Sequence, residues 1–242
     1  AQTKEEEAKA AATACDKGAT SPLDPQGKAP PVYISDMNPT FDRKVTEDLI
    51  VACRTAALAF PDEQRFAIQL ARHAGATVAT TVGARNAELA RALGADIVID
   101  YKAQRFEDVV SGQDLVFDTQ AGDIQHRSFA VLKRGGVLVS IAGKPDGRLV
   151  REFGLNPLLG VLLDFLSRKS LRLAKQHGVR YEYLFMHPSG EQLEKIGRLL
   201  ADGSLRPVID KVFPLDQVRE ALAYSEAGHA TGKVVVEVKA AG

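Results

Sequence analysis

Short apolar runs alternate with helical patterns through the middle of the chain, over residues 66–143. Alanine and leucine recur every three or four residues over 67–74, which is the spacing of one face of a helix. The run 77–82 is short and β-branched, as a buried parallel strand is, and 97–99 repeats this pattern after a second helix over 85–94. Strands that alternate with short helices predict a parallel sheet wound with helices, which binds ligands at the carboxyl ends of its strands.

The alternation continues toward the carboxyl end of the chain. Further strands are predicted over 114–118, 137–141, 180–186, 207–213 and 233–238. Further helices are predicted over 124–133, 157–177, 191–202 and 215–226, with a loop over 145–154. Asn156 can cap the longest helix and Pro157 suits its first position, while Gly178 ends it. The expected fold class is α/β, a Rossmann-like parallel sheet with helices on both faces, preceded by a short helical N-terminal segment.

The same pattern divides the chain into three regions. Residues 1–41 are expected to be irregular and polar, because proline and glycine crowd 18–31. Residues 42–75 are interpreted as a helical pair that leads into the sheet, with a tight turn at Pro61-Asp62. Residues 76–242 are expected to form the Rossmann-like domain together with the elements that follow it.

Composition excludes some classes of partner. The 242 residues carry 31 Lys and Arg against 31 Asp and Glu, so the formal net charge is zero. A neutral chain argues against nucleic acid or an anionic membrane as the main partner. No apolar run approaches the roughly 20 residues that a membrane-spanning helix needs.

Cysteine and histidine offer little chemistry. The chain has only two cysteines, Cys15 and Cys53. They are either two buried thiols or one disulfide in an oxidising compartment, and two cysteines alone do not decide between these interpretations. The five histidines are scattered, without ligand spacing or cysteine partners, so no zinc site is expected.

The front of the chain carries several loose motifs. They are Ala14-Cys15-Asp16, Ser21-Pro22-Leu23-Asp24-Pro25, Ala52-Cys53-Arg54-Thr55-Ala56 and Phe60-Pro61-Asp62-Glu63-Gln64-Arg65-Phe66. With these motifs, residues 12–66 resemble the opening of secreted bacterial proteins with Sel1-like or tetratricopeptide-like helical repeats. The resemblance implies a periplasmic origin, a disulfide between Cys15 and Cys53, and a helical module for protein interaction.

The remainder of the chain carries motifs whose order and spacing are more specific than any one of them. They are Leu93-Gly94-Ala95-Asp96, Val98-Ile99-Asp100-Tyr101, Phe106-Glu107-Asp108, Val116-Phe117-Asp118, Leu132-Lys133-Arg134-Gly135-Gly136, Leu138-Val139-Ser140-Ile141-Ala142-Gly143, Arg206-Pro207-Val208, Phe213-Pro214-Leu215 and Gly232-Lys233-Val234-Val235-Val236. With them, residues 67–242 resemble the carboxyl part of the medium-chain dehydrogenase/reductase superfamily. The nearest branch is that of the zinc-independent quinone oxidoreductase-like reductases that use NADPH.

This resemblance implies an adenosine side for the cofactor at the end of the strand 77–82. There Thr81, Gly83 and Arg85 would select the 2′-phosphate of NADPH, and Tyr101 would border the adenine. A guanidinium is a fixed-charge fork suited to phosphate, and no acidic residue occupies that strand end. The alternatives are that Arg85 is a solvated residue at a helix start and that Tyr101 packs across a strand end.

The resemblance also implies a nicotinamide side at the ends of the neighbouring strands. The residues that would border it are Thr119, Ser140, Ile141, Ala142 and Gly143, with Leu184, Phe185 and Met186 on the far wall and Lys233 reaching the cofactor. For Phe185 and Met186, hydrophobic core is the better interpretation. For Lys233, a surface position on a strand is equally plausible.

In this branch a hydride passes between NADP(H) and a small-molecule substrate, either a quinone or an activated alkene. The protein chiefly positions both and excludes water, so no catalytic residue is assigned. The resemblance further implies a cytoplasmic location and association as a homodimer.

The chain departs from the family pattern in two places. The family has an amino-terminal barrel-like catalytic domain, which the residues before 67 do not resemble. Its glycine-rich phosphate loop corresponds to 56–65, which has no glycine and places Asp62 and Glu63 where pyrophosphate would bind. The first strand of the sheet is therefore expected to be absent or improvised.

These departures keep other functions open. A secreted helical front joined to a reductase-like back would make the chain chimeric. Beside the reductase, we consider a non-catalytic reductase-like scaffold, which the missing glycines favour, and a helical-repeat interaction module, which rests on the front alone.

Overall fold

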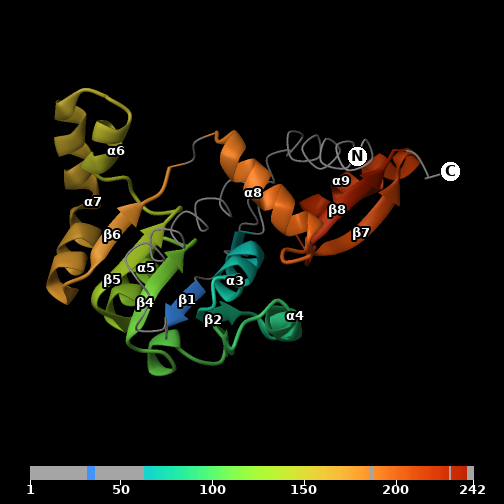
Figure 1. The fold of residues 1–242 in the computed structure, drawn as a ribbon, viewed down its shortest axis with the longest axis horizontal. Coiled ribbons are helices and arrows are strands. Elements are labelled where there is room, and N and C mark those ends of the chain that lie inside the picture. Colours follow the sequence, from blue (N-terminus) through green and yellow to red (C-terminus); the bar gives the residue numbers. More distant parts are fainter. Residues whose placement is uncertain (1–31, 36–62, 186–187, 229, 239–242) are drawn as a thin grey trace. The chain divides into compact units, whose positions relative to one another are not determined.

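The computed structural model describes residues 32–35, 63–185, 188–228 and 230–238 (Figure 1). They fall into two compact units. The sheet unit contains the described residues up to 189, and the C-terminal unit contains those from 190 onward. The predicted disulfide, most of the predicted helical pair and residues 56–62 of the segment that replaces the glycine-rich loop lie outside the described residues.

The sheet unit is built on one six-stranded sheet. Its strands are β1 (Val32–Ser35), β2 (Thr77–Val82), β3 (Ile97–Asp100), β4 (Gln113–Asp118), β5 (Leu132–Ser140) and β6 (Arg180–Tyr183). They lie in the order β3-β2-β1-β4-β5-β6. The pairs β2–β3, β4–β5 and β5–β6 are parallel, so the carboxyl ends of these five strands share one edge of the sheet. The Rossmann-like α/β fold is thereby confirmed.

The strand β1 corrects the expectation of irregular structure throughout 1–41. It lies between β2 and β4 and is antiparallel to both, with Val32 opposite Thr80 and Phe117. Its sequence Val-Tyr-Ile-Ser is β-branched and aromatic, which suits a strand. Strands β2 and β4 each need a partner for their facing backbone groups, and β1 supplies it. The sheet is consequently mixed.

Helices cover both faces of the sheet. They are α3 (Glu63–His73), α4 (Ala87–Ala92), α5 (Gly122–Ser128), α6 (Gly147–Glu152) and α7 (Pro157–His177). On one face, Ile68 of α3 and Ala90 of α4 pack against Leu115 and Phe117 of β4. On the other face, Val116 of β4 and Leu138 of β5 pack against Phe129, Ala174 and Tyr181. Successive side chains of β4 therefore point to opposite faces of the sheet and belong to two separate hydrophobic cores.

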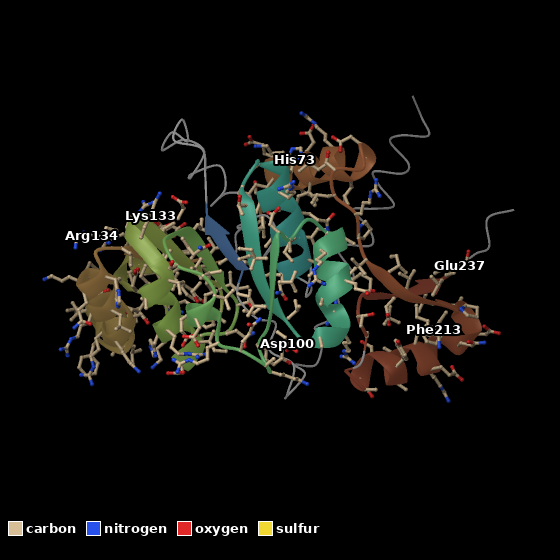
Figure 2. The ribbon with its side chains drawn as sticks, turned by 90° about the horizontal axis from the view of Figure 1, so that it is seen from below. His73, Asp100, Lys133, Arg134, Phe213 and Glu237 are labelled. Carbon is tan, nitrogen blue, oxygen red and sulfur yellow. The ribbon has the colours of Figure 1, made fainter. Side chains whose placement is uncertain are left out.

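Helix α3 runs against the direction of the parallel strands. Its last residue, His73, and the last residue of β3, Asp100, consequently lie at opposite ends of the sheet unit (Figure 2). The amino end of α3 therefore faces the edge of the sheet where the strands end.

Two element boundaries differ from the predictions. The loop predicted over 145–154 contains α6, because Asp146 caps that helix by accepting the N–H of Arg148 at 2.9 Å. The helix predicted over 124–133 ends at Ser128, and Leu132 already belongs to β5, where it pairs with Gln113. Tertiary pairing overrides the helical pattern there.

The ends of α7 follow the prediction. The Asn156 side chain accepts the N–H of Leu158 at 3.0 Å, Pro157 is the first helical residue, and Gly178 adopts a left-handed φ of 66° after the last turn. None of the helices within the described ranges is long and apolar enough to cross a membrane.

Helix α7 buries small residues and exposes large apolar ones, whereas an amphipathic helix usually buries its large apolar residues. Its buried residues are small: Gly160, Ser167, Ser170 and Ala174. Its outward face carries Leu158, Val161 and Phe165, which are 77%, 70% and 60% exposed.

The C-terminal unit contains two helices and two strands among its described residues, with a 3₁₀ turn over Leu215–Gln217 before the second helix. They are α8 (Gly190–Ala201), β7 (Ile209–Pro214), α9 (Val218–Glu226) and β8 (Lys233–Glu237), as the sequence predicts to within a few residues. Strands β7 and β8 are parallel. Asp210 ties the unit together by accepting hydrogen bonds from the Tyr224 hydroxyl at 2.6 Å and the Thr231 hydroxyl at 2.5 Å.

Candidate functional site

A buried glutamine of α3, Gln64, binds the end of β2. The Gln64 amide Nε2 donates to the Thr80 hydroxyl at 2.6 Å and to the Thr81 carbonyl at 2.8 Å. Thr81 itself is buried, so its side chain lies inside the unit rather than on the surface. The sequence analysis missed Gln64, because nothing local relates it to residues 16 and 17 positions later.

Gly83 and Tyr101 are neighbours beyond the ends of β2 and β3. A Cβ at Gly83 would lie 3.7 Å from the Tyr101 ring, which is half exposed. Arg85 is exposed in the 3₁₀ turn Ala84–Asn86 that begins just beyond Gly83. Of the four residues predicted for the adenosine side, Gly83, Arg85 and Tyr101 thus lie at one exposed corner of the sheet edge, while Thr81 is buried beneath it. Their roles stay a prediction.

A buried carboxylate lies at the end of β4. Oδ1 of Asp118 accepts the N–H groups of Gln120 at 3.0 Å and Ala121 at 3.1 Å. Oδ2 accepts Nε2 of Gln125 and the hydroxyl of Ser140, both at 2.7 Å. Asp118 has no exposed surface, so these four bonds replace the water it has lost.

The backbone just after Asp118 is strained. Ala121 has φ 60° and ψ −167°, a conformation that residues other than glycine rarely adopt, and Gly122 follows with φ 62°. The two bonds from Oδ1 of Asp118 hold this turn in place. Strained backbone that is held this firmly is frequent at ligand sites, and the segment 119–121, here called the β4 loop, includes the predicted residue Thr119.

The segment 141–144, here called the β5 loop, is joined to the β4 loop through Ser140. The hydroxyl of Ser140 accepts the N–H of Gly143 at 2.8 Å while it donates to Asp118. A Cβ at Gly143 would lie 2.5 Å from the Tyr181 hydroxyl and 2.7 Å from Ser140 Oγ, so only glycine fits there. Ser140 is fully buried, whereas Ala142 is exposed. Ser140 is therefore a support for the predicted site.

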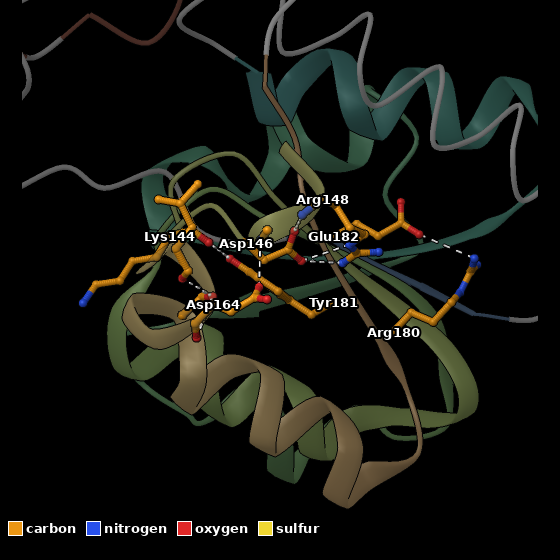
Figure 3. Close-up of polar contacts among 10 residues, drawn as sticks. Lys144, Asp146, Arg148, Asp164, Arg180, Tyr181 and Glu182 are labelled. Atoms are coloured by element: carbon orange, nitrogen blue, oxygen red, sulfur yellow. Dashed lines mark hydrogen bonds and ion pairs between the residues drawn. The ribbon is translucent and has the colours of Figure 1, made fainter. Parts of the chain in front are cut away.

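Side chains of β6 and α7 bind Lys144, at the end of the β5 loop, and Gly147, shortly after it (Figure 3). The Tyr181 hydroxyl donates to the Lys144 carbonyl at 2.8 Å. Burial, with the negative charge of Asp118 adding to it, raises the pKa of the Tyr181 phenol, which keeps the donor protonated. The Gly147 N–H donates to Asp164 on α7 at 2.7 Å, and Arg148 pairs with Asp146 at 2.8 Å (Figure 3).

The remaining predicted residues come from β6, the segment after it and the C-terminal unit. Leu184 is buried in the core, and its N–H donates to the Ser140 carbonyl at 2.9 Å. Phe185 is about half exposed and meets Phe153 edge-to-face at 5.4 Å, so the interpretation of Phe185 as hydrophobic core is wrong. Lys233 belongs to the C-terminal unit, where its N–H donates to the Val208 carbonyl at 2.7 Å. Met186 lies outside the described residues.

Histidine, cysteine and carboxylate side chains are spread out in the part of the chain that the structure describes. Nowhere in 32–35, 63–185, 188–228 or 230–238 do three or more His, Cys, Asp or Glu side chains gather where they could hold a metal ion.

Comparison with known proteins decides the family. The family model described as "Zinc-binding dehydrogenase" matches residues 93–236, more than half of the chain. The chain belongs to the zinc-binding dehydrogenase family. This family lies in the medium-chain dehydrogenase/reductase superfamily, so the resemblance found in residues 67–242 is confirmed. The resemblance of residues 12–66 to helical-repeat proteins stays a prediction.

Relatives of this chain include reductases. The mouse protein named "NAD(P)H oxidoreductase RTN4IP1, mitochondrial" is 36% identical over 72% of this chain and 44% of its own length. The "NADPH-dependent alkenal/one oxidoreductase, chloroplastic" of Arabidopsis thaliana is 33% identical over 70% of this chain and 36% of its own. The quinone oxidoreductase structure from Coxiella burnetii is 30% identical, with a TM-score of 0.54 over 72% of this chain and 48% of that protein. The chain thus spans less than half the length of each.

Proposed function

We propose that the chain is an NADP(H)-dependent oxidoreductase that reduces a quinone or an activated alkene. The observation that carries the proposal is the pair of loops at the carboxyl edge of the sheet, held rigidly by the buried Asp118 beside the exposed corner at Arg85. Ligands of open α/β sheets bind at this edge. The names of the mouse, plant and Coxiella proteins support the same chemistry.

On this proposal the adenosine end of the cofactor binds at the ends of β2 and β3. Arg85 would form charge-assisted hydrogen bonds to the 2′-phosphate, since its side chain is exposed and a guanidinium fork matches phosphate oxygens. The Tyr101 ring, which lies close to Gly83, would border the adenine. Gly83 and the end of β2 at Thr81 would complete this side.

The nicotinamide end would lie along the β4 and β5 loops, bordered by Thr119, Ile141, Ala142 and Gly143 above their support Ser140. The bound cofactor supplies the hydride. The residues of the chain would position it and exclude water, with Phe185 proposed as a further contact. The chain would act without a metal.

Calorimetric titration of NADPH and NADH into the purified chain tests this function. We expect micromolar binding of NADPH and weaker binding of NADH. Arg85→Ala should weaken NADPH binding by about 1.5–3 kcal/mol, roughly 10- to 100-fold, and leave NADH binding unchanged. The matched control is Arg91→Ala on the exposed side of α4.

Failure of the native chain to bind either nucleotide at millimolar concentration would reject this function. The second candidate, a non-catalytic reductase-like scaffold, would then hold, as the glycine-free segment 56–65 with its two carboxylates favours. Equal loss of affinity in both arginine variants would instead reject the specific role of Arg85.

We further propose that two copies associate as a homodimer through α7. Leu158, Val161 and Phe165 supply an apolar outward face, and α7 packs beside β6, the edge strand of the sheet. A second copy presents the same face, which makes the contact self-complementary. A cytoplasmic location is part of the same proposal, with the periplasm as the alternative.

A further inference from the structure

A single side chain of α5 contacts both loops of the candidate site. Gln125 is 2% exposed. Its amide Nε2 donates to Asp118 at 2.7 Å, below the β4 loop, and to Ser140 at 2.9 Å, below the β5 loop. One NH₂ group therefore uses its two hydrogens to join the ends of two neighbouring strands.

A third element also binds this amide. The carboxylate of Asp118 can only accept a hydrogen bond, so the NH₂ group of Gln125 faces Asp118 and Ser140. The carbonyl oxygen Oε1 then faces α7, where the Ser170 hydroxyl donates to it at 2.9 Å. Gln125 thus has a partner for every polar atom of its side chain, and a change at any of them would disturb the others.

The same amide lies directly against the β5 loop. A Cβ at Gly143 would collide with Gln125 Nε2, and the N–H of Gly143 is bound by the Ser140 hydroxyl that Gln125 also contacts. Gln125 thus lies between Gly143 and Asp118, the residue that holds the strained turn at Ala121.

We propose that Gln125 is a positioning residue for the nicotinamide end of the cofactor. It acts through Asp118, Ser140 and Gly143, holding the β4 and β5 loops at one spacing without itself touching the ligand. The proposal rests on the proposed function, because it needs a nicotinamide between those loops. It is specific to one end of the cofactor, because Arg85 and Tyr101 lie at the ends of β2 and β3.

Two ligands separate the two ends of the cofactor. NADPH engages both ends, whereas adenosine 2′,5′-bisphosphate carries only the adenosine end and its 2′-phosphate. Both are titrated calorimetrically into the full chain and into Gln125→Leu, which keeps the side-chain bulk and removes the amide. We expect NADPH affinity to fall about tenfold or more and bisphosphate affinity to stay within about twofold.

The matched control is Gln113→Leu. Gln113 is equally buried on the same strand β4, but at its amino end, where its amide donates to the Ser111 carbonyl at 2.9 Å. This control should leave the ratio of the two affinities unchanged. Ser170→Ala frees the amide of Gln125 without removing it, and should lower NADPH affinity alone by about threefold, which keeps the test available if Gln125→Leu does not fold.

Each other outcome contradicts the proposal in a different way. Equal losses for both ligands would mean that Gln125 only stabilises the unit. Unchanged NADPH affinity in Gln125→Leu and Ser170→Ala would mean that the spacing of the loops is set elsewhere. Absence of binding by the native chain to either ligand would overturn the proposed function, and this inference with it.

Discussion

Single residues decide how the candidate site is held, and several of them could not be predicted. Ser140 and Gly143 stand out in the sequence because they end a predicted strand. Their partner Gln125 does not, because it contacts Ser140 across 15 positions and Ser170 across 45. Periodicity reports neighbours on one face of one element, and hydrogen bonds between elements leave no such trace. The sequence therefore points to Ser140 and Gly143 but not to their partner Gln125.

The carboxyl group of Glu107 makes the free energy of unfolding depend on pH. Glu107 is mostly buried and accepts bonds from Arg105 at 2.6 Å and Arg127 at 3.0 Å. Burial by itself raises the pKa of this carboxyl, but its backbone hydrogen bond and the two arginines together hold the pKa below its usual value. A lowered pKa stabilises the fold at pH values above the usual carboxyl pKa, and this stabilisation is lost as pH falls through the folded-state pKa.

Glu107→Gln should consequently lower the free energy of unfolding at about pH 6, and the gap to the native chain should narrow by about pH 3. Urea titrations at both pH values measure this. Glu88→Gln, on the exposed side of α4, is the matched control. A gap that stays constant with pH would show that the ion pairs of Glu107 do not stabilise the fold.

At the scale of elements, the two ends of α7 could be predicted from capping residues that lie next to them in the sequence. The first and last residues of α7 were predicted correctly, because Asn156 and Pro157 begin the helix and Gly178 ends it through local bonds and backbone angles. Helix α6 was missed because it has six residues and depends on Asp164, which lies 17 positions away from Gly147. The strand β1 was missed for the same reason, since its two partners lie far along the chain.

The cap of α7 is directly testable. Asn156→Ala removes the acceptor for the Leu158 N–H and should lower the free energy of unfolding by about 0.5–2 kcal/mol in urea titrations. Asn156→Asp retains a capping oxygen and should stay close to the native value. Equal losses in both variants would assign the effect to something other than the cap.

At the scale of the whole molecule, the order of the motifs predicted the family. The proposed homodimer can be tested by its size in solution. Sedimentation velocity should find a dimer, and Phe165→Glu should convert it to a monomer, because a carboxylate would be buried in the apolar contact. Gln176→Glu, on the same outward face of α7 but near its other end, should leave the dimer intact. A monomeric native chain would contradict the proposal.

The placement of β1 sets an order on how the sheet assembles. Strands β2 and β3 form one parallel pair, and β4, β5 and β6 form another group, each from consecutive stretches of chain. Within the described residues, only β1 connects the two groups by hydrogen bonds, and it enters from more than 40 positions before β2. Closing so long a loop is slow relative to local pairing. The two halves can therefore form early, and the sheet becomes continuous in a late step when four residues dock between them.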